Sequence, residues 1–278
     1  MSDAFKIAGK VVGKITGRNK NAQIGALLNQ VPSNDLLNEI VFFLPLNEES
    51  GVVAADASAQ GNDGEAFFAG ILGNAGVIDT YAADFADPFR NVEIPNADSL
   101  LTSYNNITFN AWIKRTLDAT TASMKRIFTI PRTVGGSTGL GFGWGIDHFL
   151  QVFTYDEGNY VLVKSAFEIP LNVPTMVTLV INDDTIKLFA NGVLVKSGNA
   201  IITEELSAAP LILGNSTGGD LYHMEGNMNW ASLNQIAWTD QQVLDVYNDG
   251  NGFFLSEWLL KPQTVLNSDT PLNSNTSL

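Results

Sequence analysis

The chain has 278 residues, 45% of them apolar, which is enough material for a sizeable core and excludes a globally disordered protein. Cysteine is absent, so disulfides and thiolate chemistry are excluded. The net charge is −14, but residues 1–20 hold five basic residues and one acid, a net charge of +4, so the rest carries −18. An acidic body repels nucleic acid, and no apolar run approaches the ~20 residues that span a bilayer, so we expect neither a nucleic-acid partner nor a membrane span.

Residues 1–40 are expected to form a basic docking arm followed by a helical connector. From position 5 to 18, a basic, an apolar and a glycine position each recur every four residues, and on a helix such series form separate stripes. The basic stripe, which we expect to dock on a partner, consists of Lys6, Lys10, Lys14 and Arg18. A solvated terminus is the alternative, because the three glycines each cost about 1 kcal/mol of helix propensity.

Residues 41–64 contain an apolar strand, an acidic turn and then a loop rich in Asp, Asn and Gly. Calcium prefers several hard oxygen ligands, which such a loop can supply. The candidate calcium ligands are Asp56, Asn62 and Asp63. The same residue types are equally the ordinary chemistry of turns, so a calcium site and a purely structural loop both stay open.

Two segments in the middle of the chain are predicted strands with unequal faces. In residues 108–114, Phe109, Ala111 and Ile113 share one face and Trp112 lies on the other. In residues 139–146, glycine occupies every second position and leaves one face bare. A bare face lets a ligand approach closely, but large residues of neighbouring strands can equally cover it.

Residues 147–155 offer a candidate glycan-binding face. Sugars need an aromatic platform together with hydrogen-bonding side chains, and alternate residues of a strand share one face. The candidate ligand-binding residues are Trp144, Asp147, Phe149, Gln151, Phe153 and Tyr155. Core packing of Phe149 and Phe153 is the competing interpretation.

Residues 176–196 contain the strongest fold signal in the chain. Three β-rich runs are separated by turn residues, and the second turn is Asn191-Gly192. A two-residue type I′ turn needs positive φ at both central positions, which Asn tolerates and Gly adopts freely. The pattern predicts an antiparallel three-stranded meander at the centre of a sheet.

The last regular element is a predicted helix over residues 239–250. Thr239 and Gln242 form a capping box, Trp238 is placed to contact Val243, and Gly250 is placed to end the helix. Residues 251–278 begin with an apolar segment, expected to cover the sheet, the connector or a partner subunit, and continue as a polar tail.

Short motifs in a fixed order resemble the laminin-G-like, concanavalin A-like jelly-roll family, from Leu44 to Tyr247. The most similar motif is the run from Lys187 to Gly192, which matches the family's "lYvNG" pattern. The other matching pieces are Leu44-Pro45-Leu46, the loop from Asp56 to Gly64, Ala83-Asp84-Phe85, the strand from Phe109 to Lys114, Leu213-Gly214, Gly226 to Met228, and the helix from Trp238 to Tyr247.

The resemblance implies an all-β jelly roll over residues 41–250, with two antiparallel sheets packed face to face. This chain departs from the family's pattern at Met176, where the family has Trp nearby, and at Asn229 and Trp230, where the family has an acidic pair. The second departure weakens the transfer of any calcium site that uses those acids.

Glycan binding is the commonest function that this resemblance implies, on fold-level analogy. Some relatives are glucanases with an acidic E-x-D-x-x-E strand, and this sequence has no such run. The two histidines, His148 and His223, lack an accompanying nucleophile-elbow motif. We therefore expect a protein that is not an enzyme.

A bacteriophage virion-surface protein is the preferred hypothesis, with the basic arm anchored to other virion structural proteins and the jelly roll displayed for glycan or host attachment. Lys10 and Lys14 interrupt any apolar signal-peptide core, and phage proteins leave the cell by lysis. Further copies of this chain are candidate partners. The alternative is an exported bacterial carbohydrate-binding module or adhesin, and a glycosidase is a third interpretation.

Overall fold

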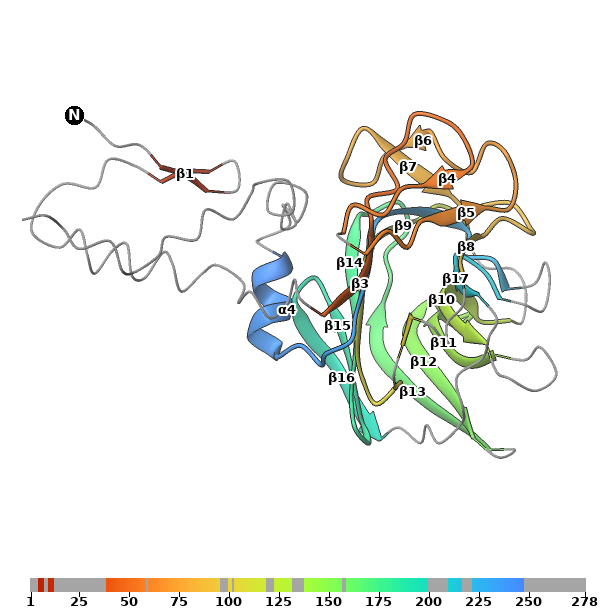
Figure 1. Ribbon diagram of the computed structural model, residues 1–278. Coiled ribbons are helices and arrows are strands. Elements are labelled where there is room, and N and C mark those ends of the chain that lie inside the picture. Colours follow the sequence, from red (N-terminus) through yellow and green to blue (C-terminus); the bar gives the residue numbers. More distant parts are fainter. Residues whose placement is uncertain are drawn as a thin grey trace, which may run out of the picture.

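The computed structural model describes residues 5–7, 10–12, 39–58, 60–95, 100–101, 103–118, 123–131, 138–156, 159–199, 210–216 and 222–247. Within these ranges the fold is a sandwich of two eight-stranded antiparallel sheets with one short helix (Figure 1). The all-β fold class predicted from the sequence is therefore confirmed.

We call the first sheet the open sheet. In spatial order it consists of β13 (Asn159–Glu168), β12 (Phe149–Asp156), β11 (Thr138–Trp144), β10 (Lys125–Pro131), β17 (Leu211–Leu213), β8 (Val92–Ile94), β5 (Gly64–Ala66) and β4 (Val53–Ala54).

We call the second sheet the covered sheet, because a helix packs on its outer face. Its strands are β16 (Val193–Asn199), β15 (Thr185–Ala190), β14 (Thr175–Asn182), β9 (Asn106–Arg115), β18 (Gly226–Asn234), β7 (Tyr81–Asp84) and β6 (Asn74–Ala75), with β3 (Ile40–Leu44) paired to β18. The helix is α4 (Asp240–Tyr247).

The predicted meander is strands β14, β15 and β16, paired in sequence order. Its second turn has φ of 50° at Asn191 and 77° at Gly192, as a type I′ turn requires. The meander does not lie at the centre of its sheet: β16 is an edge strand, and β14 joins the meander to β9.

Two hydrophobic cores account for the burial of the covered sheet on both faces. The main core lies between the sheets and includes Phe109, Ala111 and Ile113. The alternation of apolar residues in the sequence predicted that these three side chains share one face of the strand. The second core lies between the covered sheet and α4, and includes Trp112 from the opposite face of β9. A sheet buried on both sides reads as nearly continuous apolar sequence.

The capping box predicted at the start of α4 is confirmed. The Thr239 backbone N–H donates to Gln242 Oε1 at 2.7 Å, and the Gln242 backbone N–H donates to Thr239 Oγ1 at 3.2 Å. Trp238 and Val243 are both buried in the second core. In the described part of the chain, no helix has the length and apolar character needed to cross a membrane.

The structure corrects the predicted helical arm for residues 5–12. Residues 5–7 and 10–12 form two antiparallel strands, β1 (Phe5–Ile7) and β2 (Lys10–Val12), paired with Phe5 opposite Val12. β-branched Ile and Val have low helix propensity and interspersed glycines lower it further, so the period of four does not outweigh local preference. Lys6 and Lys10 lie in these strands, whereas Lys14, Arg18, most of the predicted connector and residues 251–278 lie outside the described residues.

Candidate functional site

Strands β12 and β13 at one side of the open sheet present side chains to solvent. In β13, Val163 and Ser165 are buried while Tyr160, Leu162 and Lys164 are exposed. This alternation marks a sheet with one packed face and one solvated face. Figure 1 shows α4 beside β14, β15 and β16, away from β11 and β12, so the helix does not cover this face.

The register of β12 and β13 gathers aromatic side chains on that solvated face. Tyr155 lies opposite Tyr160, and Phe153 lies opposite Leu162. The Tyr155 and Tyr160 rings are edge to face with centroids 4.7 Å apart, and the Phe153 and Tyr160 centroids are 6.0 Å apart. Tyr160 is 68% exposed. We call Phe153, Tyr155 and Tyr160 the aromatic platform.

Polar groups continue the same face toward the β11–β12 turn. Gln151 lies opposite Lys164, whose ammonium donates to the Asp147 carboxylate and lies 5.3 Å from the Phe149 ring centroid. The hydrogen bond from Lys164 lowers the pKa of Asp147 below its ordinary value. Of the residues predicted for the glycan face, the structure therefore brings together Asp147, Phe149, Gln151, Phe153 and Tyr155.

Trp144 does not belong to this face, and its inclusion in the prediction was wrong. Its β11 position lies opposite Leu150, and both side chains are fully buried in the main core. Pleating points Trp144 to the same side as Leu140 and Phe142. The register pairs Gly143 with Gln151 and Gly141 with Phe153, so the outer face of β11 carries its glycines and the core face carries Trp144.

Residues of neighbouring strands cover the bare glycine face of β11. This agrees with the interpretation that neighbouring residues, and not a ligand, lie against the glycines. A Cβ added at Gly141 would lie 1.7 Å from Arg126 Nη1 and 2.4 Å from Phe153 Cε1. At Gly143 it would lie 1.8 Å from the Lys125 carbonyl oxygen. The missing side chain at Gly141 leaves the space that the Arg126 guanidinium occupies.

Arg126 of β10 is a residue that the sequence analysis missed. It is 6% exposed, and its guanidinium carbon lies 4.0 Å from the Phe153 ring centroid and 5.1 Å from that of Tyr222. Burial lowers the pKa of Arg126 to about 9, while Tyr222 and Tyr160 act in the opposite direction, so the side chain is charged at neutral pH. Its Nε and Nη1 atoms have no hydrogen-bond partner.

Tyr160 and Lys164 were missed as well, although the turn between residues 156 and 159 was available as a signal. A hairpin read at that turn places Tyr160 opposite Tyr155 and Lys164 opposite Gln151. Nothing local signals Arg126, because its neighbours Gly141 and Phe153 come from strands paired across the sheet.

The predicted calcium ligands hold their own loop together. Asp56 Oδ1 accepts the backbone N–H groups of Phe43 at 2.9 Å and Ser58 at 2.8 Å, and Oδ2 accepts the Ser58 hydroxyl and the Asn62 backbone N–H, both at 2.7 Å. Asn62 Nδ2 donates to the Val41 carbonyl, and Asp63 Oδ1 accepts the Asp56 backbone N–H. As they lie, the three side chains close a loop rather than converge on a cation, and calcium binding here stays a prediction.

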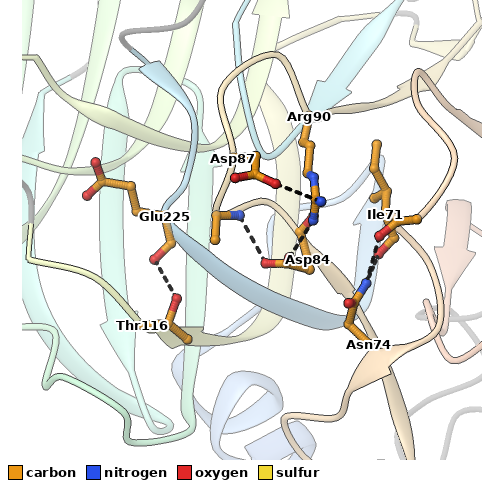
Figure 2. Close-up of polar contacts among 9 residues, drawn as sticks. Ile71, Asn74, Asp84, Asp87, Arg90, Thr116 and Glu225 are labelled. Carbon is orange, nitrogen blue, oxygen red and sulfur yellow. Dashed lines mark hydrogen bonds and ion pairs between the residues drawn. The ribbon is translucent and has the colours of Figure 1, made fainter.

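A second polar cluster lies in the loops that flank β7. Figure 2 shows the Arg90 guanidinium between Asp84 and Asp87, and its Nη2 lies 2.7 Å from Asp87 Oδ2. Asn74 Nδ2 donates to the carbonyl of Ile71 at 2.8 Å. In this cluster the Arg90 guanidinium has two carboxylate partners, whereas no carboxylate among the described residues pairs with the guanidinium beneath the aromatic platform. The platform is therefore the stronger candidate for ligand recognition.

Residues 89–252 match the family model described as the concanavalin A-like lectin/glucanases superfamily. The chain belongs to this superfamily. The match covers the aromatic platform, Arg126 and α4, and agrees with the two-sheet sandwich. A search of curated protein sequences found no match.

Solved structures of similar fold include proteins of several kinds. The binding domain of Paraclostridial Mosquitocidal Protein 1 has a TM-score of 0.58 at 14% identity, covering 77% of this chain and 53% of that chain. Domain 4 of AbnA, an extracellular arabinanase from Geobacillus stearothermophilus in complex with arabinotriose, has a TM-score of 0.54 at 15% identity, covering 74% of this chain and 97% of that domain. A Trypanosoma rangeli sialidase has a TM-score of 0.56 at 13% identity, covering 77% of this chain and 33% of the sialidase.

These identities establish a shared concanavalin A-like fold and nothing finer. The chain spans about half the length of the mosquitocidal binding domain and about a third of the sialidase.

Proposed function

We propose that this chain is a non-enzymatic glycan-binding domain that uses the solvated face of β12 and β13. The observation that carries the proposal is the exposed Tyr160 ring against half-buried Tyr155 and Phe153, on the face of the open sheet that α4 leaves free. Aromatic rings stack on the apolar faces of sugars, while the Asp147–Lys164 pair offers hydrogen bonds at the rim, next to buried Gln151. The arabinotriose complex of AbnA domain 4 supports this as a fold-level analogy.

A binding role fits the chemistry of this face better than catalysis. A glycosidase needs a carboxylic acid whose pKa is raised so that it can protonate the leaving group. The hydrogen bond from Lys164 instead lowers the pKa of Asp147, which keeps this carboxyl ionised near neutral pH. Asp147 is therefore suited to accepting hydrogen bonds from sugar hydroxyls.

A glycan array probed with the full chain tests the proposal. We expect Tyr160→Ala and Tyr155→Ala each to weaken binding about tenfold, because losing a stacked ring removes roughly 1 kcal/mol or more. Val193→Ser is the matched control, since Val193 is 62% exposed on β16 of the covered sheet. Equal binding by all four proteins, or no binding to any glycan by the folded chain, would contradict the proposal.

For the biological setting we propose display on a bacteriophage virion, anchored through Lys6, Lys10, Lys14 and Arg18. The support is the charge contrast within the sequence, +4 in residues 1–20 against −18 in the remainder, which suits docking on an acidic shell. Deletion of residues 1–20 is expected to remove the protein from purified particles. Undiminished attachment would contradict the anchoring, whereas absence of the full-length chain from particles would favour an exported bacterial carbohydrate-binding module.

A further inference from the structure

Arg126 is a buried cation beneath the aromatic platform, and it has no carboxylate partner within the part of the chain that the structure describes. Arg126 is 6% exposed, and two of its three guanidinium nitrogens, Nε and Nη1, are buried with no hydrogen-bond partner. A guanidinium carries five N–H donors, and burying donors without acceptors is unfavourable. Cation–π contacts with Phe153 and Tyr222 offset this cost only in part, because ring faces do not accept hydrogen bonds as strongly as oxygens do.

The cations around Arg126 have acidic partners. Lys125, the preceding residue, lies 2.7 Å from Glu225 Oε1, and Lys164 on the same face of the sheet pairs with Asp147. Arg126 pairs with no carboxylate in the described part of the chain. Among the described residues, the guanidinium beneath the aromatic platform is therefore a positive charge without an acidic partner.

We propose that the ligand of the aromatic platform is an acidic glycan, whose carboxylate is the acceptor that Arg126 lacks. The inference rests on the proposed function and narrows it from glycans in general to those bearing a carboxylate. A carboxylate matches the guanidinium fork with two parallel N–H···O bonds. The flanking rings exclude water, which strengthens such a pair relative to one in bulk solvent.

Access to Arg126 requires a side-chain movement. Nε and Nη1 are covered, and the rings closest to the guanidinium belong to Phe153 and Tyr222, which are only half-buried. Rotation of one of these rings exposes the nitrogens and leaves the backbone in place, a change common at binding interfaces. The ligand's sugar ring then stacks on the platform while its carboxylate reaches the guanidinium.

An array of uronate- and sialate-bearing oligosaccharides, each paired with its methyl ester, tests the inference on the full chain. The ester keeps the sugar and removes the charge. We expect wild type to bind at least one acid about tenfold or more tightly than its ester. Equal binding of acid and ester, or binding of neutral glycans alone, would overturn the inference while leaving the proposed function intact. Binding of no glycan at all would contradict the proposed function itself.

Calorimetry with the acid and ester of the most tightly bound glycan then tests whether Arg126 causes the preference for the acid. Arg126→Met should abolish the preference for the acid. Lys196→Met removes the same charge from exposed β16 and should retain the preference. A preserved preference in Arg126→Met would overturn the assignment to Arg126. Should that variant not fold, the acid–ester comparison on wild type still decides whether the face selects acids.

Discussion

At the scale of single residues, Asn229 connects separate loops to the covered sheet. It is fully buried in β18, and its Oδ1 accepts the Val77 backbone N–H at 2.8 Å. Its Nδ2 lies within 3.2 Å of the backbone carbonyl oxygens of Pro45, Leu46 and Tyr81. An amide N–H suits three carbonyls, whereas a carboxylate would repel them. This explains why an asparagine fits this position and an aspartate does not.

Replacing Asn229 should therefore destabilise the fold strongly. We expect Asn229→Ala to lower the free energy of unfolding by roughly 2–5 kcal/mol, because several buried backbone groups lose their partner. Asn199→Ala, on exposed edge strand β16, should stay within about 0.5 kcal/mol of wild type. Urea denaturation measures both, and equal stability of the two variants would contradict this role for Asn229.

Gly141 shows how a missing side chain makes room for a charge. We expect Gly141→Ala to cost about 1–3 kcal/mol of stability, because its Cβ would lie 1.7 Å from Arg126 Nη1. In an Arg126→Ala background the cost should fall by about 1 kcal/mol or more, since the overlapping group is gone. Urea denaturation of the four proteins completes this double-mutant cycle. An unchanged cost in both backgrounds would show that the guanidinium is not what Gly141 accommodates.

At the scale of elements, α4 determines which sheet face stays free. Its buried residues Val243 and Val246 join Trp112 in the second core, so the covered sheet has no solvated face at this point. Lys187 of β15 lies 2.7 Å from Asp240 at the N-terminus of α4, a position where a carboxylate also favours the helix dipole. With one sheet covered by the helix, surface chemistry is left to the outer face of β12 and β13.

The capping box is the local feature that most directly stabilises α4. We expect Thr239→Ala to lower the free energy of unfolding by about 1 kcal/mol, because the Gln242 N–H loses its acceptor. Gln241→Ala is the control within the same turn, because its side chain makes only an exposed bond to Asp245, and should change stability by no more than about 0.5 kcal/mol. Thermal or urea unfolding compares them, and a reversed order would contradict the capping role.

At the scale of the whole molecule, the negative net charge of the chain opposes the approach of an acidic glycan. The chain carries −14 overall, so an acidic glycan approaches against a repulsive field and is held only by a short-range contact to Arg126. Salt screens exposed charges over about 8–10 Å, while a desolvated contact is screened much less.

The association rate of an acidic glycan should therefore rise with ionic strength. We expect a severalfold increase in the association rate constant between about 10 mM and about 150 mM salt, measured by stopped-flow fluorescence or surface plasmon resonance. The methyl ester of the same glycan should associate at a rate that hardly changes. A rate for the acid that falls with salt would indicate steering by a basic surface and contradict this electrostatic picture.

The sequence by itself determined the features whose cause is local. Strand alternation in residues 108–114, the positive-φ turn at Asn191 and Gly192, and the capping box at Thr239 each depend on neighbours a few residues apart. The order of short motifs along the chain, through the family resemblance, also predicted the two-sheet sandwich. These signals are enough for the fold class because period, turn chemistry and capping are properties of short segments.

Tertiary structure alone decided which faces meet. Trp144 shares one face of β11 with Leu140 and Phe142, and packing of the two sheets made that face the buried one. Residues 5–7 and 10–12 paired as antiparallel strands, although their period of four suited a helix. Arg126 came to lie over Gly141 and under Phe153 through pairing of three different strands. An unpaired charge can only be recognised once every acceptor around it is known, and those acceptors are distant in sequence. The sandwich could thus be predicted from interactions between residues close in sequence. The position of Arg126, the residue proposed to select the ligand, is decided only by packing between distant segments.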